Sequence, residues 1–424
     1  MDLLVAAALA ISLGVPGRSN TDVTLAARGH SVVAAWTGTT AEGLSDVYVA
    51  TSADDGATFG SPVRVNDVAG QAKTSGEQPP RVTLVAVAGS GVPRIQVVWT
   101  AQGSAGGRLL TSHSDDGGRT FAPAAPVPGS DAPGNRGWES VAPTSDGSVT
   151  AVWLDHRDLA PQPGAAASHA GHAGHDHMAG HSSEGMAAGS KLLGTRLDGG
   201  GQAQVIAAGV CYCCKTAIAA SSGGVLSVAW RQVYDGNIRD IAFSRSTDNG
   251  RTYAVPVRVS EDRWVLNGCP DDGPSVAVDG AGRVHILWPT LVPGQDGAEP
   301  ALGLFYSSSS DGRTFAPRTR VAVGGVPHHP QIAATASGRL VFAWDEVRDG
   351  VRRVVMATGR LDGDGRLSLV PATSPPGTPS SYPALSISGD DVLVAWTAGA
   401  AGKSVINVER LGVSTRPAGA HSSR

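Results

Sequence analysis

Lysine is scarce in this chain, and positive charge is not in excess. Only four of the 424 residues are lysine, and 33 basic side chains stand against 37 acidic ones, which gives a net charge of −4. Binding to nucleic acid or to an anionic membrane surface depends on a basic patch. The sequence contains none, so we expect neither nucleic acid nor a membrane surface as a partner.

Long hydrophobic runs are also missing. A transmembrane helix needs about 20 consecutive apolar residues, and no segment reaches that length. The apolar stretch within residues 1–15 has the length of a signal-peptide core, but no positive charge precedes it and no clear cleavage site follows it. It is interpreted either as a signal remnant or as a strand that closes the fold.

Glycine and proline, in contrast, are abundant. The 56 glycines and 27 prolines, together with many Val, Thr and Ser residues, are typical of short strands separated by tight turns. An all-β fold is therefore expected. One closed β architecture can absorb the whole length, so residues 16–411 are predicted to form a single domain, followed by a disordered tail at 412–424.

A short hydrophobic stretch that ends in tryptophan occurs seven times. The tryptophans are Trp36, Trp99, Trp153, Trp230, Trp288, Trp344 and Trp396. Their spacings are 63, 54, 77, 58, 56 and 52 residues, and the longest contains an insertion. Repetition at such a period indicates an array of similar units. Seven copies favour seven units over six.

A second pattern, SxDxGxT followed by an aromatic residue, lies between the tryptophan strands. Ser52–Phe59, Ser114–Phe121 and Ser246–Tyr253 match it, and 308–315 matches with Ser310 in place of the aspartate. Eroded copies stand at 196–202 and 360–366. In a hairpin turn, glycine supplies a positive φ while the Ser and Asp side chains bind nearby backbone amides, so the pattern is interpreted as structural.

These motifs resemble those of the Asp-box (BNR) repeat proteins of the sialidase superfamily. The stretch VCYCCKTA at 210–217, followed by GCPDDGP, is similar to that of CxCC-containing bacterial members, which are exported. The resemblance implies a β-propeller of four-stranded antiparallel blades and a periplasmic or secreted location. The last repeat supplies only three strands, so residues 8–13 are a candidate for the missing fourth strand.

Antiparallel strands place the starts of all inner strands on one face of a propeller. The residues at these starts include every cysteine, namely Cys211, Cys213, Cys214 and Cys269, and the histidines His328 and His329. Thiolates and imidazoles are ligands of copper and zinc, and the sulfur-rich set favours copper. A metal site at the channel mouth is predicted, with zinc as the alternative ion. A disulfide or a redox role for the same cysteines stays open.

The loop after the third tryptophan strand contains a His/Met-rich insertion at 159–190. Its candidate metal ligands are His169, His172, His175, His177, Met178 and His181. A solvated Gly/Ala/Ser loop would have a similar composition. Histidines at such short intervals also suit a mobile arm that captures metal, and an exported metal-handling protein is a candidate partner that would supply it.

The sequence is also compatible with two functions other than metal binding. A sialidase-like exo-glycosidase would use Tyr382 with Glu139 and Asp155, and Arg157, Arg231 and Arg348 would clamp a carboxylate. The Arg-Ile-Pro motif of sialidases is missing, since Pro93-Arg94-Ile95 has another order, and the arginines also fit a structural role in salt bridges. The second alternative is a carbohydrate or protein interaction module that contains a disulfide.

Overall fold

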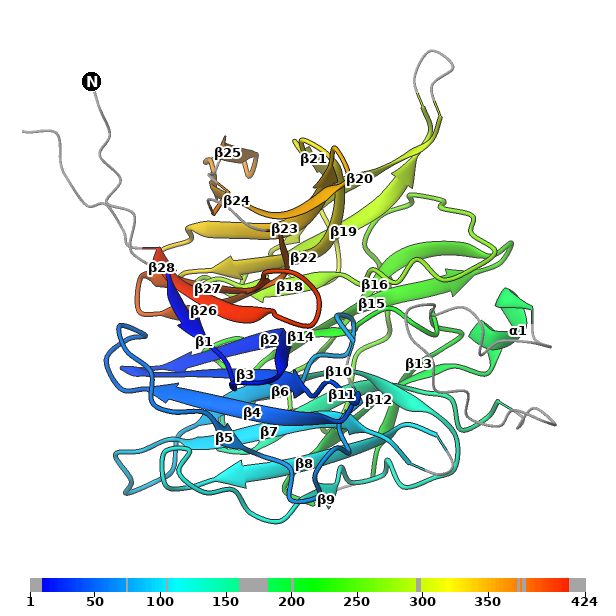
Figure 1. Ribbon diagram of the computed structural model, residues 1–424. Helices are drawn as coiled ribbons and strands as arrows, with labels where there is room; N and C mark the ends of the chain where they lie inside the picture. Colours follow the sequence, from blue (N-terminus) through cyan, green and yellow to red (C-terminus); the bar gives the residue numbers. More distant parts are fainter. Residues whose placement is uncertain are drawn as a thin grey trace, which may run out of the picture.

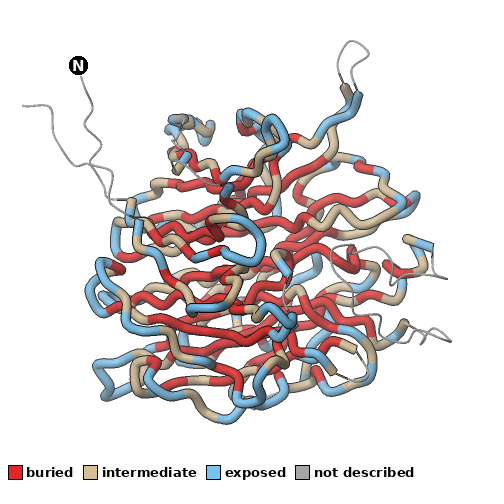
Figure 2. Tube along the Cα trace, viewed as in Figure 1, coloured by how far each residue is buried: buried red, intermediate tan, exposed pale blue. Residues whose placement is uncertain are grey.

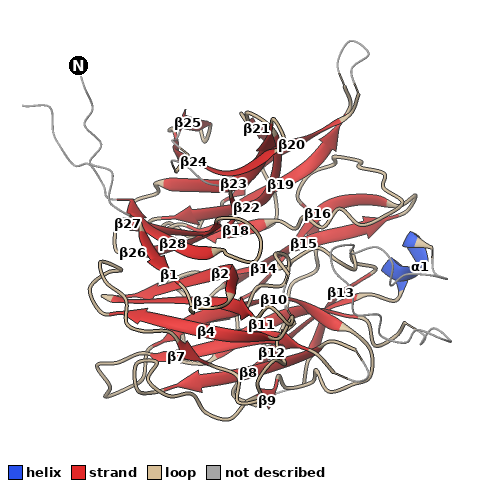
Figure 3. Cartoon of the chain, viewed as in Figure 1, coloured by secondary structure: helices blue, strands red, loops and turns tan. Residues whose placement is uncertain are grey.

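The computed structural model describes residues 10–73, 75–103, 106–159, 182–199, 202–294, 299–371, 374–375 and 379–411. Over these residues the strands form seven four-stranded antiparallel sheets, arranged as the blades of a propeller (Figure 1). This confirms the predicted fold and the blade number of seven. Among these residues the one helix is α1 (Ser183–Ala188), and Figure 3 shows strands joined by loops in the rest of the fold. Within the described part of the chain, no helix has the length and apolarity needed to cross a membrane. The predicted tail at 412–424 lies outside the described residues.

The first three blades follow one another along the chain. Blade one contains β2 (Ser19–Arg28), β3 (Ser31–Thr39), β4 (Ser45–Ser52) and β5 (Val63–Arg64). Blade two contains β6 (Arg81–Val85), β7 (Arg94–Ala101), β8 (Arg108–Ser114) and β9 (Ala125–Pro126). Blade three contains β10 (Arg136–Pro143), β11 (Val149–Asp155), β12 (Lys191–Arg196) and β13 (Gln204–Ala208), with α1 (Ser183–Ala188) before β12.

The remaining blades repeat the same order. Blade four contains β14 (Ala217–Ala220), β15 (Leu226–Tyr234), β16 (Ile238–Ser246) and β17 (Val257–Arg258). Blade five contains β18 (Ser275–Val278), β19 (Val284–Val292), β20 (Ala301–Ser309) and β21 (Thr319–Val321). Blade six contains β22 (Val326–Ala334), β23 (Leu340–Arg348), β24 (Val351–Leu361) and β25 (Leu367–Pro371). Blade seven contains β26 (Ser380–Ser388), β27 (Asp391–Ala398), β28 (Val405–Leu411) and β1 (Ile11–Leu13).

The N-terminal strand β1 completes the last blade. It pairs antiparallel with β28, with Ile11 opposite Val408 and Leu13 opposite Ile406, and the two lie side by side in Figure 1. The pairing covers the edge of β28, which would otherwise expose free backbone groups. Of the two interpretations of residues 1–15, residues 11–13 therefore follow the one in which a strand closes the fold. Residues 1–9 lie outside the described part of the chain.

The tryptophans of the repeat lie on the second strand of every blade. Each is at most 3% exposed, packed among the Val, Ala and Leu residues that alternate along the strands. Figure 2 shows that buried residues follow the strands and that exposed residues gather at the turns. Burial of a large aromatic ring between adjacent sheets explains why the repeat retains one tryptophan per unit.

The SxDxGxT segments form the turns between the third and fourth strands. In blade two, Ser114 Oγ accepts a hydrogen bond from Gly118 N at 2.9 Å, while Asp116 accepts from Thr120 N and Thr120 Oγ1 at 3.0 and 2.6 Å. Blades one and four repeat these contacts. Each side chain therefore holds its own turn together.

Blade five corrects one detail of this pattern. The aligned motif begins at Ser308 and places Ser310 at the aspartate position. In the structure Ser309 Oγ accepts from Gly312 N, and Asp311 Oδ1 accepts from Thr314 N, both at 2.9 Å. The turn is one residue shorter, so the motif starts at Ser309 and retains its aspartate as Asp311.

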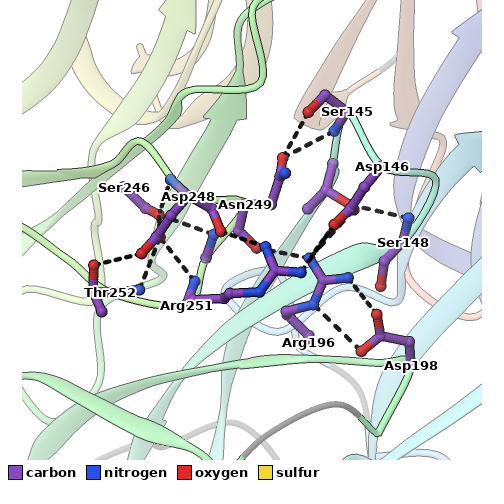
Figure 4. Close-up of polar contacts among 12 residues, drawn as sticks. Ser145, Asp146, Ser148, Arg196, Asp198, Ser246, Asp248, Asn249, Arg251 and Thr252 are labelled. Atoms are coloured by element: carbon purple, nitrogen blue, oxygen red, sulfur yellow. Dashed lines mark hydrogen bonds and ion pairs between the residues drawn. The ribbon is translucent and has the colours of Figure 1, made fainter.

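The same turns connect neighbouring blades. In Figure 4, Arg251 from the blade-four turn and Arg196 from β12 both reach Asp146, at 3.3 and 3.0 Å. Asn249 Oδ1 accepts hydrogen bonds from the amide and hydroxyl groups of Ser145. These contacts fix blade four against blade three on the face opposite the inner-strand starts.

Candidate functional site

Several inner strands begin with a β-bulge. The pairing register shifts near the start of β2, β10, β22 and β26. Each bulge contains a non-glycine residue with positive φ, namely Asp22 (60°), Trp138 (55°), His329 (50°) and Tyr382 (52°). Bulges re-aim side chains, and strained backbone of this kind concentrates at functional sites. The channel mouth is therefore the first place to search for function.

The four cysteines gather at this mouth, as the strand topology predicted. Cys211, Cys213 and Cys214 precede β14, and Cys269 precedes β18. The Cys211 sulfur lies 3.3 Å from that of Cys214 and 3.9 Å from that of Cys213. Cys213 and Cys269 form a disulfide with a Cα separation of 6.2 Å, whereas Cys211 and Cys214 are free and buried. Both a sulfur cluster and a disulfide are thus present.

Two buried arginines lie beside this cluster. Arg239 Nη1 donates to the Cys211 sulfur at 3.0 Å, and Arg231 donates to the main-chain oxygens of Asp272, Pro289 and Arg239. Burial alone would raise the pKa of Cys211, but the hydrogen bond with Cys214 and the charges of the two arginines lower it to about 6. Burial and the neighbouring Cys211 raise the pKa of Cys214. These surroundings therefore favour the thiolate form of Cys211.

The ends of the predicted His/Met insertion also reach the sulfur cluster. Leu159 packs against the cluster before the insertion, and Met186 of α1 packs against it afterwards and is 6% exposed. Ser183 of α1 accepts a hydrogen bond from Arg239. The predicted ligands His169, His172, His175, His177, Met178 and His181 lie outside the described residues.

The histidines His328 and His329 contact carboxylates rather than sulfur, which corrects the predicted mixed ligand set. His328 Nδ1 lies 2.7 Å from Asp272 Oδ2. His329 Nδ1 lies 2.9 Å from Asp345 Oδ2, while its amide donates to Asp272 Oδ1 at 2.7 Å. Among the described residues, the groups spaced to share an ion are Cys211/Cys213/Cys214, Cys213/Cys269/Asp271 and Glu77/Asp272/His329. None combines cysteine with histidine.

A cavity of about 210 Å³ lies between the inner strands beside His329. Its lining includes Asp22, Lys215, His329 and Tyr382. Burial raises the pKa of Asp22 to about 6 and also raises the pKa of Tyr382. Burial raises the pKa of the nearby Glu77 as well, against the positive charge of Lys215. Carboxyls whose pKa is raised by burial are candidates for proton transfer to a bound molecule.

The predicted carboxylate clamp is not assembled. Arg157 binds Asp155 through both Nε and Nη2, at 2.8 Å each, and Trp153 donates to the same carboxylate. Arg348 binds Glu346 at 2.9 Å, where Trp344 also donates. Two tryptophan strands thus end in the same Trp, acid and arginine contact. Such contacts fit the structural role considered for these arginines.

Two further predicted residues are occupied elsewhere. Arg231 is 1% exposed, and its guanidinium donates to main-chain oxygens and lies over the ring of Trp264 at 4.9 Å. Glu139 is fully buried and accepts a hydrogen bond from Thr100 at 3.0 Å. Tyr382 alone among the predicted catalytic residues lines the cavity, with its ring 4.2 Å from that of His329.

Four residues of the mouth are not among the predicted site residues. Glu77, Asp272 and Asp345 are buried carboxylates there, and Arg239 contacts sulfur. Asp272 lies in the GCPDDGP segment and Glu77 shortly before β6, so the signal for both is their position just before an inner strand. Arg239 lies on β16, and no motif marks it.

The chain was compared with known proteins. No family model matches it, and no curated protein matches it. Among solved structures, an ulvan lyase of family PL25 bound to -[GlcA(1-4)Rha3S]- has a TM-score of 0.55 at 11% identity, covering 95% of this chain and 96% of that chain. The GH93 α-L-arabinofuranosidase of Fusarium graminearum with arabinobiose has a TM-score of 0.51 at 12% identity, covering 96% and 98%. At these identities the likeness shows that the chain shares the propeller fold of these proteins.

Proposed function

We propose that this chain binds a soft transition-metal ion, copper(I), through Cys211, Cys213 and Cys214. One observation carries the proposal. Arg231 and Arg239 are 1% and 0% exposed, and the hydrogen bonds that their guanidiniums donate, among the described residues, go to main-chain oxygens, to the Cys211 sulfur and to the neutral side chains of Ser183 and Asn237. Buried cations without a counter-charge are costly. The neighbouring sulfurs supply that counter-charge when they are ionised.

The sulfur geometry supports a three-coordinate site. The three sulfurs lie within 4.8 Å of one another, and the thioether residue Met186 packs in the same cluster. Thiolate and thioether ligands select copper(I). The three cysteines are at most 6% exposed, so water would be largely excluded from a bound ion.

The charge balance favours copper(I) over zinc. Three thiolates and one copper(I) ion carry two net negative charges, and the two guanidiniums match them. With zinc the same site would keep one uncompensated positive charge in a buried place. Zinc also prefers four ligands in structural sites, whereas these sulfurs form a group of three.

The proposed copper site belongs to a protein that we infer to be exported. The His/Met-rich sequence at 159–190 would collect copper from solvent or from another exported metal-handling protein, since both of its described flanks contact the cysteine cluster. The periplasmic or secreted location follows from the resemblance to CxCC-containing proteins. Binding of copper by the thiolates would then be the final step of capture.

Metal titration tests the proposal. Protein reduced and kept without air should bind one equivalent of copper(I) in competition with a chromogenic copper(I) chelator, with a thiolate-to-copper absorption in the ultraviolet. Cys211→Ser and Cys214→Ser should each lower the affinity at least tenfold. Ser52→Ala, in a distant turn, is the matched control. Unchanged affinity in both cysteine variants would refute the site.

A second candidate function is the processing of a glycan in the channel cavity. The observation that favours it is the pair of protonatable carboxyls Asp22 and Glu77 near Tyr382 and His329. Since Arg157, Arg231 and Arg348 have other partners, the substrate need not be a sialoside. Screening chromogenic glycosides and polysaccharides, with Tyr382→Phe as the comparison, tests this candidate. No turnover above the Tyr382→Phe background would reject it.

A further inference from the structure

Cys213 belongs to two sulfur groups at once. It is one of the three sulfurs that lie within 4.8 Å of one another, and it is also joined to Cys269 by the disulfide. A sulfur bound in a disulfide has no thiolate charge to give to a metal ion. With the disulfide formed, therefore, only Cys211 and Cys214 remain as thiol ligands.

The two ends of this disulfide differ in their access to solvent. Cys213 is 6% exposed, while Cys269 is half-buried in an irregular segment between β17 and β18. That segment contains no strand pairing around Cys269, so its sulfur can separate from Cys213 without breaking a sheet. A reagent from solvent therefore reaches the disulfide from the Cys269 side.

We propose that the Cys213–Cys269 disulfide is a redox gate on the copper site, which opens when an external dithiol reduces it. The inference rests on the proposed copper(I) binding by Cys211, Cys213 and Cys214. In the oxidised protein the site lacks its third thiolate. In the reduced protein Cys213 completes the site, and the metal it holds then protects it from reoxidation.

The chemistry of opening is thiol–disulfide exchange. One thiolate of the external dithiol attacks the Cys269 sulfur, the bond between Cys213 and Cys269 breaks, and Cys213 leaves as a thiolate. The second thiolate of the dithiol attacks the mixed disulfide and releases Cys269. The dithiol becomes a disulfide, two electrons and two protons pass to the protein, and the proton of Cys213 is released when copper binds.

The arginines explain the direction of attack. The leaving sulfur of Cys213 lies 3.9 Å from that of Cys211, which Arg239 contacts. A departing thiolate joins the Cys211 thiolate there, and the positive charges of Arg231 and Arg239 balance the two negative charges. Cys269 instead has the Asp271 carboxylate 3.3 Å away, which disfavours a thiolate there. Attack at Cys269 with departure of Cys213 is favoured on both counts.

The test compares copper(I) affinity in two redox states of the whole chain. Protein with the disulfide verified by intact mass should bind copper(I) at least 100-fold more weakly than protein reduced by dithiothreitol and desalted without air. Cys269→Ser leaves Cys213 without its disulfide partner. This variant should therefore bind one equivalent of copper(I) both before and after reduction by dithiothreitol. Cys269→Ala repeats the test with another side chain, and Cys213→Ser should bind weakly in both treatments.

The outcomes separate the gate from the site. Equal affinity of the oxidised and reduced proteins would overturn the gate and leave copper binding in place. Failure of the reduced protein and of Cys269→Ser to bind copper(I) would overturn the proposed function together with the gate. Circular dichroism of each variant confirms that the propeller is folded before its affinity is compared.

Discussion

The guanidinium of Arg239 lies 3.0 Å from the sulfur of Cys211, although the two residues are 28 positions apart, with Arg239 on β16 and Cys211 in the irregular segment before β14. The guanidinium also lies over the ring of Tyr212 at 5.4 Å and donates to Asn237. The contact joins β16 to the segment before β14. The segment and the strand that supply Cys211 and Arg239 therefore both belong to blade four.

Replacing Arg239 tests the electrostatic part of the copper site. Arg239→Gln removes the charge that stabilises the Cys211 thiolate, so we expect copper(I) affinity to fall at least tenfold, which corresponds to about 1.4 kcal/mol. Arg239→Lys should retain part of the affinity. Arg245→Gln, further along β16, is the matched control. Competition with a copper(I) chelator measures all three, and equal losses in Arg245→Gln and Arg239→Gln would contradict the explanation.

A pH dependence of stability should arise from Asp22. Burial raises its pKa from 3.8 to about 6, so the folded state binds a proton more tightly than the unfolded state does. This contribution is fully present below pH 3.8 and is lost as the pH rises through 6. Asp22→Asn should therefore raise the free energy of unfolding at pH 7.5 by up to about 3 kcal/mol, with little change at pH 3.5.

Urea unfolding at the two pH values measures the Asp22 effect. Asp131→Asn, at an exposed carboxylate, is the control. It should change the free energy of unfolding little at either pH. A gain in Asp22→Asn that is the same at pH 3.5 and pH 7.5 would show that burial of the carboxyl is not its cause.

Fold and cysteine position were predictable because both follow from periodicity and strand direction. Seven tryptophan strands predict seven blades, since each repeat must bury one large ring. Strand direction then places the residues before β14 and before β18 on one face, which brings Cys211 and Cys269 together. No knowledge of side-chain orientation is needed for either step.

The contact partners of the site residues could not be predicted from the sequence, because they depend on side-chain orientation. Strand alternation fails at the bulges that contain Trp138, His329 and Tyr382, so a position at the rim did not reveal which neighbour His329 would contact. Its partner Asp345 lies on β23 and is fully buried. Arg239 is likewise one of many arginines, and only its contact with Cys211 distinguishes it.

The shortened turn of blade five leads to a prediction about Ser310 and Asp311. The repeated motif places Ser310 at the aspartate position. In the structure, however, Asp311 Oδ1 accepts the hydrogen bonds that Arg313 N and Thr314 N donate. Asp311→Ala should therefore lower the thermal midpoint, and Ser310→Ala should leave it unchanged because that side chain is exposed. Differential scanning calorimetry measures both, and the reverse order would restore the register of the aligned motif.

Closure of the ring depends on the short strand β1. Leu13 is 8% exposed and packs in one cluster with Trp36, Ile406 and Val408, so it connects blade seven to blade one. Leu13→Ala should lower the free energy of unfolding by about 2 kcal/mol, at the low end for a buried leucine because the strand is at a sheet edge. Ser12→Ala, whose side chain is exposed and bonds Asn407, should change it by less than about 0.5 kcal/mol. Urea unfolding measures both, and equal effects would mean that β1 adds pairing to β28 but no packing to the core.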